Sequence, residues 1–234
     1  MIRKVDNAPM TSSIRFAPLK TYMMPNASDE YRAARENLID AELALREHVQ
    51  RVAELRRTLP AGPTIPDYEF VEGDKRVRLS ELFSDGKPYL LMYHVMYWQD
   101  DQEFCPMCSM WVDGLDGVAH HIAQRANIVA ATLAPADKAR AWAKHRGWQR
   151  IRFLADADPS FQRDSGAEIQ EDNPQSTVLV FEKTADGIRH VYTAHAEFPN
   201  GLNNGVDMIC ATWHMFDLLP SGRGDWYAKN DYVT

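Results

Sequence analysis

Apolar residues recur along the chain with two different periods. Between residues 28 and 60 they alternate three- and four-residue steps, which is typical of a narrow apolar seam along one face of a long helix. Arg56 and Arg57 suit the carboxyl end of such a helix, and Pro60 ends it. The seam consists of Leu38, Ala41, Leu45, His48, Val52, Leu55 and Leu59. Spacing alone does not say what covers it: either a second copy, in a homodimer formed through residues 28–60, or the chain's own domain.

Beyond residue 60 the apolar residues form short continuous runs instead. Such runs are typical of strands buried on both faces of a sheet, and helical segments separate several of them. The turn at Asp186-Gly187 favours a closing hairpin. The predicted strands cover 68–71, 77–79, 89–95, 128–133, 152–155, 177–181 and 189–193, and the predicted helices cover 106–125, 136–146 and 206–219. This order predicts an α/β fold with a mixed sheet flanked by helices.

The same pattern divides the chain into three parts. Residues 1–27 place prolines among polar residues and predict an extended arm. Residues 28–60 form an N-terminal helical arm. The prolines and glycine of residues 60–66 mark a linker, after which residues 61–234 form the α/β domain.

Composition narrows the functional classes. The chain has 234 residues and a net charge of −7, so a general nucleic-acid binder with a basic face is not expected. No apolar run reaches the roughly 18 residues of a membrane span. Residues 1–25 lack the apolar core, about 7–15 residues long, of a secretory signal. We therefore expect a cytoplasmic protein, whose three cysteines do not form a structural disulfide framework.

Two of the cysteines form a local pair with the spacing of a redox dithiol. Cys105 and Cys108 lie between a predicted buried strand and a predicted helix. At the start of a helix, unpaired N–H groups and the helix dipole lower the pKa of a thiol, so Cys105 is the expected nucleophile. Cys108 lies one turn further on and is expected to resolve a mixed disulfide or a sulfenic acid. Pro106 suits the first helical position because it has no N–H to leave unpaired.

Other features of this stretch bear on whether the pair is active. Asp100, Asp101 and Glu103 lie just upstream, and like charge disfavours a thiolate if these side chains approach it. Two inert core cysteines are an alternative interpretation.

Zinc is a further alternative, because His120 and His121 follow the pair. Adjacent histidines on a helix point about 100° apart, however, and zinc ligands are usually spaced. We expect no metal and no cofactor. Cys210 lies between Ile209 and Ala211 in a predicted helix and is interpreted as a small core residue.

Three further side chains are candidates for supporting the thiols. His94 ends the central predicted strand, where it is either a proton donor or base facing the thiols or a satisfied core histidine. Trp111 lies three residues after Cys108 on the same helix face, for core packing or for substrate stacking. Arg223, between two glycines, either reaches an anion or the nucleophile or remains in solvent.

The chain resembles a known family at several separate points. The matching segments are Leu55-Arg56-Arg57-Thr58-Leu59-Pro60, Leu79-Ser80-Glu81-Leu82-Phe83, Tyr93-His94-Val95-Met96, Cys105-Pro106-Met107-Cys108-Ser109, Trp111-Val112-Asp113-Gly114, Arg146-Gly147-Trp148 and Pro220-Ser221-Gly222-Arg223. Through them the chain resembles a bacterial family of unknown function whose members are described as predicted dithiol-disulfide oxidoreductases. That family is related to the thiol-specific antioxidant and peroxiredoxin group. The resemblance implies a thioredoxin-like fold, while the family's activity is itself inferred from that fold.

Two positions depart from the patterns of these relatives. Peroxiredoxins place Thr or Ser three residues before the reactive cysteine, where this chain has Gln102. Thioredoxins place a cis-proline directly before the strand that faces the cysteines, where this chain has Ser176. Pro174 lies two residues earlier, and X-Pro bonds are trans by default.

The sequence therefore predicts a thiol-disulfide oxidoreductase in which Cys105 attacks and Cys108 resolves. Its expected partners are an unidentified disulfide or peroxide substrate and a thiol reductant. A peroxiredoxin-like thiol peroxidase is the second hypothesis, and Gln102 weakens it. A binding or structural protein that kept the fold without the activity is the third.

Overall fold

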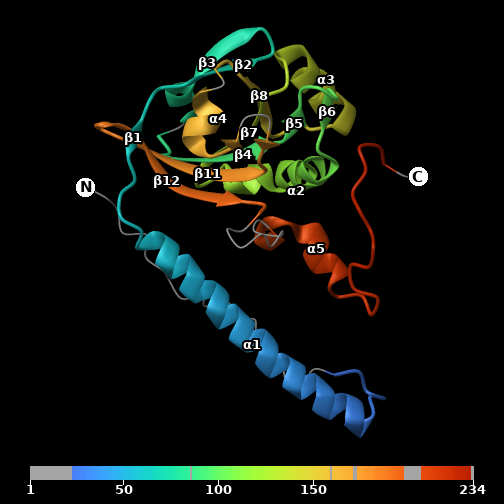
Figure 1. Cartoon of the computed structure of the whole chain (residues 1–234). Coiled ribbons are helices and arrows are strands. Elements are labelled where there is room, and N and C mark those ends of the chain that lie inside the picture. Colours follow the sequence, from blue (N-terminus) through green and yellow to red (C-terminus); the bar gives the residue numbers. More distant parts are fainter. Residues whose placement is uncertain (1–22, 85, 159, 171–172, 198–206, 233–234) are drawn as a thin grey trace. The chain divides into compact units, whose positions relative to one another are not determined.

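The computed structural model describes residues 23–84, 86–158, 160–170, 173–197 and 207–232 (Figure 1). The chain divides into two compact units, Met1–Leu59 and Pro60–Thr234. Residues 1–22, most of the predicted extended arm, lie outside the described residues. No helix in the described part of the chain is long and apolar enough to cross a membrane.

The first unit contains the long helix α1 (Asp29–Arg57), which confirms the predicted N-terminal helix. The Ser28 hydroxyl accepts a hydrogen bond from the Tyr31 N–H at 3.1 Å, as an N-cap residue does. Acidic residues occupy the first turn of α1 and basic residues the last turn, which complements the helix dipole. Leu45 and Leu55 of the seam are 64% and 67% exposed.

The second unit is built on an eight-stranded mixed sheet with the order β1-β12-β11-β4-β7-β8-β2-β3. The central strands β4, β7 and β8 are parallel, and the other neighbouring strands pair antiparallel. The bounds of the eight strands are β1 (Thr64–Ile65), β2 (Glu69–Glu72), β3 (Lys75–Arg78), β4 (Tyr89–Val95), β7 (Asn127–Thr132), β8 (Arg152–Asp156), β11 (Thr177–Thr184) and β12 (Gly187–His195). The predicted mixed α/β architecture with a closing hairpin is confirmed.

Two short ladders lie outside this sheet. The strands β5 (Tyr97–Trp98) and β6 (Glu103–Phe104) pair antiparallel and return the chain from the end of β4 to the cysteines. The strands β9 (Glu168–Gln170) and β10 (Asn173–Pro174) form the second ladder, just before β11.

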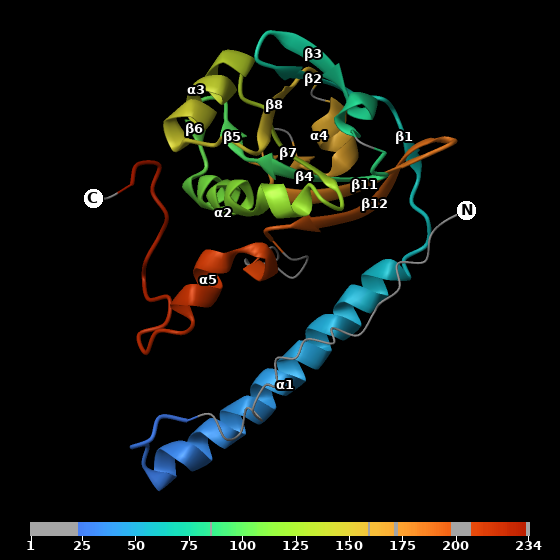
Figure 2. The ribbon, with the colours of Figure 1, turned by 180° about the vertical axis from the view of Figure 1, so that it is seen from behind.

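Helices cover both faces of the sheet. Figures 1 and 2 show α2 (Pro106–Ile122) and α4 (Ser160–Ser165) on opposite sides of β4. The helix α3 (Ala136–Arg146) ends at Gly147, whose φ of 75° is the left-handed geometry expected of a residue that ends a helix. The turn η2 (Leu79–Leu82) directly follows β3.

The helix expected over residues 206–219 is shorter than predicted. The structure has the turn η3 (Asp207–Ile209), then Cys210 in extended backbone, then α5 (Ala211–Phe216). Cys210 and Trp213 are buried, whereas Met215 and Leu218 are 58% and 75% exposed. Burial therefore does not favour a longer helix here.

Alternation along β4 assigns its side chains to two separate cores. Tyr93 and Val95 enter the core beneath α2, together with both cysteines of the pair. Leu90 and Met92 enter the core on the other face, where Phe161 of α4 packs. The site and the opposite core are thus separated by the sheet itself.

Candidate functional site

The two thiols lie at the amino-terminal end of α2. Cys105 is the N-cap residue, and Pro106 occupies the first helical position as predicted. The Cys108 N–H donates to the Cys105 sulfur at 3.4 Å. It is one of the first N–H groups of the helix, which have no backbone acceptor within the helix. Both cysteines are reduced and buried, with Cys105 5% exposed and Cys108 0% exposed.

The pKa values of the two thiols shift in opposite directions. Burial opposes ionisation of Cys108, but hydrogen bonds outweigh it and lower the pKa of that thiol to about 7. They come from the Cys105 thiol, the Met96 backbone N–H, and the hydroxyls of Ser176 and Tyr93. The hydrogen bond that Cys105 donates to Cys108, followed by burial and the negative charge on Cys108, raises the pKa of Cys105, which corrects the expectation that the helix end lowers it. In the reduced pair Cys108 therefore loses a proton more readily than Cys105 does.

A pair of buried hydroxyls stabilises that charge. The Tyr93 hydroxyl lies 2.5 Å from the Ser176 hydroxyl, and both residues are almost fully buried. Tyr93 comes from β4, whereas Ser176 directly precedes β11, the antiparallel neighbour of β4. Burial, and then the charge on Cys108, raise the pKa of Tyr93 well above its ordinary value, so Tyr93 stays a donor.

Trp111 packs in the core beside the thiols. Its ring meets that of Tyr93 edge-on, with centroids 5.8 Å apart and planes at 83°. The residue is only 6% exposed, so core packing, one of its two predicted roles, is the role that the structure gives it.

His94 lies on the opposite face of the sheet from the thiols, so of its two predicted roles the structure gives it that of a core histidine. Its Nε2 is 2.9 Å from Asp156 Oδ2, and the Gln162 amide donates to the same carboxylate at 2.7 Å. His94 and Gln162 are fully buried. The reason is the alternation of β4, which directs Tyr93 and His94 to opposite faces.

Pro174 and Arg223 are not among the contacts of the thiols. No peptide bond among the described residues is cis, so Asn173-Pro174 is trans. Pro174 lines a cavity of 120 Å³ together with Trp98 and Asp101. Arg223 donates two hydrogen bonds of 2.8 Å to the Asp217 carboxylate, and its guanidinium lies over the Trp213 ring.

Two residues of the stretch before Cys105 bond side chains from other parts of the chain. Glu103 accepts a hydrogen bond of 3.0 Å from the Asn230 amide. Gln102 bonds Lys138 and has a φ of 53°, in the left-handed region.

His120 and His121 lie in the last turn of α2, roughly 18 Å along the helix from Cys108 at 1.5 Å per residue. They cannot share a metal ion with the pair. The described residues contain no cluster of three metal-ligating side chains.

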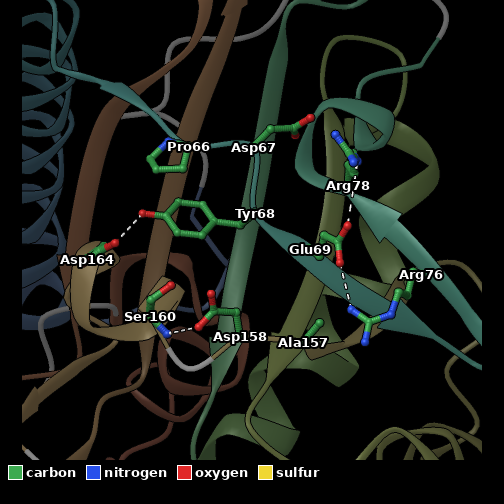
Figure 3. Close-up of a pocket in the computed structure, with 10 residues that line it drawn as sticks. All are labelled: Pro66, Asp67, Tyr68, Glu69, Arg76, Arg78, Ala157, Asp158, Ser160 and Asp164. Atoms are coloured by element: carbon green, nitrogen blue, oxygen red, sulfur yellow. Dashed lines mark hydrogen bonds and ion pairs between the residues drawn. The ribbon is translucent and has the colours of Figure 1, made fainter.

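A larger surface pocket of 580 Å³ lies away from the thiols (Figure 3). Its charged groups bond one another: the Tyr68 hydroxyl donates to Asp164 at 2.6 Å, and Arg76 bonds Glu69 at 2.8 Å. The pocket contains neither a thiol nor an acid–base pair that its own contacts leave available, so we assign it no chemistry.

Sequence reasoning missed Tyr93 and the residues of the C-terminal end that lie near the thiols. Tyr93 is hidden in an apolar run, where only its hydroxyl distinguishes it from a core aromatic. Tyr227 is remote in sequence, yet burial and then the charges of Cys105 and Cys108 raise its pKa. Neither residue has a local pattern that could have revealed its position.

Several solved structures are similar to about two thirds of the chain. Peroxidoxin BcpB from Mycobacterium tuberculosis is 21% identical, with a TM-score of 0.49 over 66% of this chain and 96% of that one. Peroxiredoxin Q from Xanthomonas campestris is 12% identical, with a TM-score of 0.47 over 64% and 95%. The exposed lipoprotein thioredoxin Etrx1 from Streptococcus pneumoniae strain TIGR4 is 16% identical, with a TM-score of 0.40 over 63% and 99%.

At these identities and scores the likeness says nothing about activity. A search of curated proteins found no match. A family model does match, over residues 22–233, which is nearly the whole chain. The chain therefore belongs to the family described as "Bacterial protein of unknown function (DUF899)".

Proposed function

We propose that the protein is a thiol-disulfide oxidoreductase that uses Cys105 and Cys108 as its redox pair. The observation that carries the proposal is a pair of free thiols, one helical turn apart, at the start of α2. Two thiols in this position can exchange with a disulfide and then close a disulfide between themselves.

Exposure and charge assign different tasks to the two cysteines. Cys105 attacks, because it is the only one of the two with any exposed surface. Cys108 holds the negative charge of the resting pair and acts as the base for Cys105. The hydrogen bond between the thiols provides the path, since the proton moves from Cys105 to Cys108 as a disulfide approaches.

The reaction balances with one substrate disulfide. The Cys105 sulfur attacks one substrate sulfur, so a mixed disulfide forms and the substrate S–S bond breaks. The first thiol leaves with the proton that the pair held. Cys108, again a thiolate, attacks Cys105, which closes the Cys105–Cys108 disulfide and releases the second substrate sulfur as a thiolate. The protein is oxidised by two electrons, and a separate thiol reductant restores the dithiol.

The test is turnover of a small disulfide by the wild type and by Cys105→Ser, Cys108→Ser and Cys210→Ser. We expect Cys105→Ser to lose turnover and Cys108→Ser to stop at a mixed disulfide that mass spectrometry detects. Cys210→Ser is the matched control, since Cys210 is also buried but is not part of the pair. Equal turnover by the wild type and Cys105→Ser would overturn the proposal.

A further inference from the structure

The C-terminal segment, residues 225–232, runs from the region of α5 past α2 and β6 (Figures 1 and 2). Its contact with the chain just before the thiols is specific. The Asn230 amide donates to the Phe104 carbonyl and to Glu103, each at 3.0 Å. Because Phe104 directly precedes Cys105, these bonds hold the segment at the entrance of the site.

Two other residues of the segment interact with the surroundings of the thiols. Ala228 is 5% exposed and belongs to the same core cluster as Cys105 and Cys108. The charges of both thiols act on the Tyr227 hydroxyl. The segment therefore contributes to the near-complete burial of the pair.

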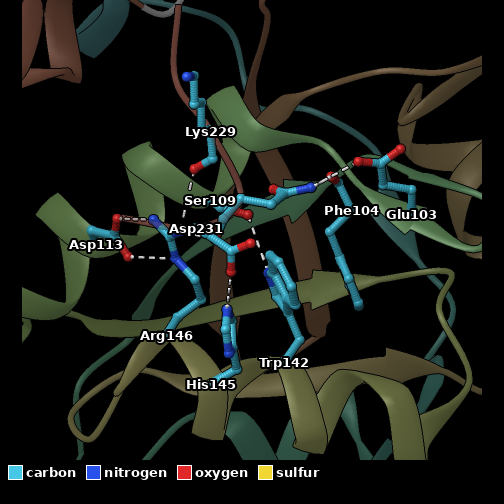
Figure 4. Close-up of polar contacts among 10 residues, drawn as sticks. Glu103, Phe104, Ser109, Asp113, Trp142, His145, Arg146, Lys229 and Asp231 are labelled. Atoms are coloured by element: carbon cyan, nitrogen blue, oxygen red, sulfur yellow. Dashed lines mark hydrogen bonds and ion pairs between the residues drawn. The ribbon is translucent and has the colours of Figure 1, made fainter. Parts of the chain in front are cut away.

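Arg146 of α3 holds the segment by its backbone (Figure 4). Its side chain is 2% exposed and donates to the Asn230 carbonyl at 2.7 Å and to the Lys229 carbonyl at 3.4 Å. Its other donors bond the Asp113 carboxylate, and its guanidinium lies 4.3 Å from the centre of the Tyr232 ring. The planar fork of arginine suits this set of acceptors, which a lysine cannot match.

Side-chain contacts hold the segment, among them those of Trp226 with Trp213 and of Asp231 with His145. Residues 225–232 form no helix or strand, so no ladder of backbone hydrogen bonds holds them. The Asn230 side-chain oxygen is buried with no hydrogen-bond partner among the described residues. Leaving such an atom unsatisfied is unfavourable, and release of the segment into water would satisfy it. A segment of this kind opens locally at a lower free energy than the whole domain unfolds.

We propose that the C-terminal segment is a cover over the dithiol and that Arg146 is the positioning residue that keeps it closed. A disulfide must bring a sulfur into line with Cys105, which the closed segment prevents for all but small molecules. Opening of the segment therefore determines the size of substrate that reaches the pair. Only the expected effect of the cover on turnover rests on the proposed function, because access to the thiols can be measured directly.

The experiment compares the rates at which Cys105 and Cys108 are modified by iodoacetamide and by a polyethylene-glycol maleimide, with the sites mapped by mass spectrometry. Arg146→Lys keeps the charge near the thiols but loses the fork. We expect it to raise the rate of maleimide modification about tenfold, which corresponds to a free energy of opening that is lower by about 1.4 kcal/mol. The rate of iodoacetamide modification should rise by less. Arg140→Gln on the same helix is the control, since Arg140 bonds exposed Asp74 instead.

A folded Arg146→Lys protein with unchanged rates for both reagents would overturn the inference. Should that variant fail to fold, Asn230→Ala decides, because it removes the bonds to Phe104 and Glu103 at a half-buried position. A faster maleimide reaction in Asn230→Ala supports the cover, and an unchanged one contradicts it. Neither rate depends on turnover, so a failed disulfide assay would overturn the proposed function while leaving the cover intact.

Discussion

The hydroxyl oxygens of Tyr93 and Ser176 lie 2.5 Å apart, and both hydroxyls hydrogen-bond the buried thiol of Cys108. A thiolate in a dry core is unfavourable unless donors replace its lost water. This pair of hydroxyls, on neighbouring strands of the sheet, supplies two of them. The contact explains how Cys108 holds a negative charge at a fully buried position.

Replacing Tyr93 by phenylalanine should therefore raise the pKa of Cys108. We expect a rise of about one unit, since a hydrogen bond to a charged group contributes about 1.5–3 kcal/mol and Ser176 remains. Ultraviolet titration of the thiolate measures it. Tyr68→Phe is the matched control, because Tyr68 donates to Asp164 on the other face of the sheet. An unchanged thiolate titration in Tyr93→Phe would show that the hydroxyl does not act on Cys108.

The stability of the reduced protein should depend on pH in two phases. The pKa of Cys108 is lowered from 9.0 to about 7, so between these values the unfolded chain binds more protons and stability rises with pH. The pKa of Cys105 is raised, so above about pH 9 the unfolded chain loses a proton that the folded protein keeps, and stability falls. Urea unfolding across this range measures both phases.

The control is the Cys105→Ser, Cys108→Ser double variant, which has no titrating pair. Its stability should lack the rise between about pH 7 and pH 9. The same slope in the double variant and the wild type would assign the effect to other groups.

We expect Asp156 to stabilise the fold without affecting the modification rate of the thiols. Asp156→Ala removes the acceptor of the buried Gln162 amide and the partner of His94 Nε2, which keep only their 3.2 Å contact with each other. Leaving a buried polar group unsatisfied costs about 1–3 kcal/mol, and we expect destabilisation of this order. Chemical denaturation measures it, and Asp74→Ala, at an exposed position, is the control.

A change of thiol modification rate in folded Asp156→Ala protein would contradict the assignment of His94 to the opposite face. The same rate as in the wild type is expected, because the sheet separates the two cores.

The exposed seam of α1 leads us to propose a homodimer formed through this helix. Leu45 and Leu55 are each more than 60% exposed, and burying such a side chain contributes about 1.5–3 kcal/mol. We expect a dimer by light scattering, and a monomer after Leu45→Glu and Leu55→Glu together. Glu47→Gln, also on α1, should leave the dimer intact. A monomeric wild type at high concentration would rule the dimer out.

The sequence predicted the sheet and the thiol pair because both are local patterns. Continuous apolar runs identified β4 and β7, and Pro106 after Cys105 marked the start of α2. The surroundings of the pair depend on contacts between distant residues. Ser176 reaches Cys108 through the pairing of β11 with β4, which no spacing in the sequence reveals.

His94 shows the limit of predictions for single residues. Its place at the end of β4 was correct, but the face to which it points depends on the register of the whole strand. A shift of one residue would exchange the positions of Tyr93 and His94. The tail residues near the thiols, Tyr227 and Ala228, lie 119 or more positions away in sequence, beyond the reach of any motif.

The central claim is that Cys105 and Cys108 form a reversible redox pair. A titration of the purified protein in glutathione buffers, with disulfides mapped by mass spectrometry, tests it most directly. We predict a single transition in which a Cys105–Cys108 disulfide forms and reopens while Cys210 stays reduced. Thiols that remain reduced across the whole range of potentials, or a disulfide that requires Cys210, would contradict the account.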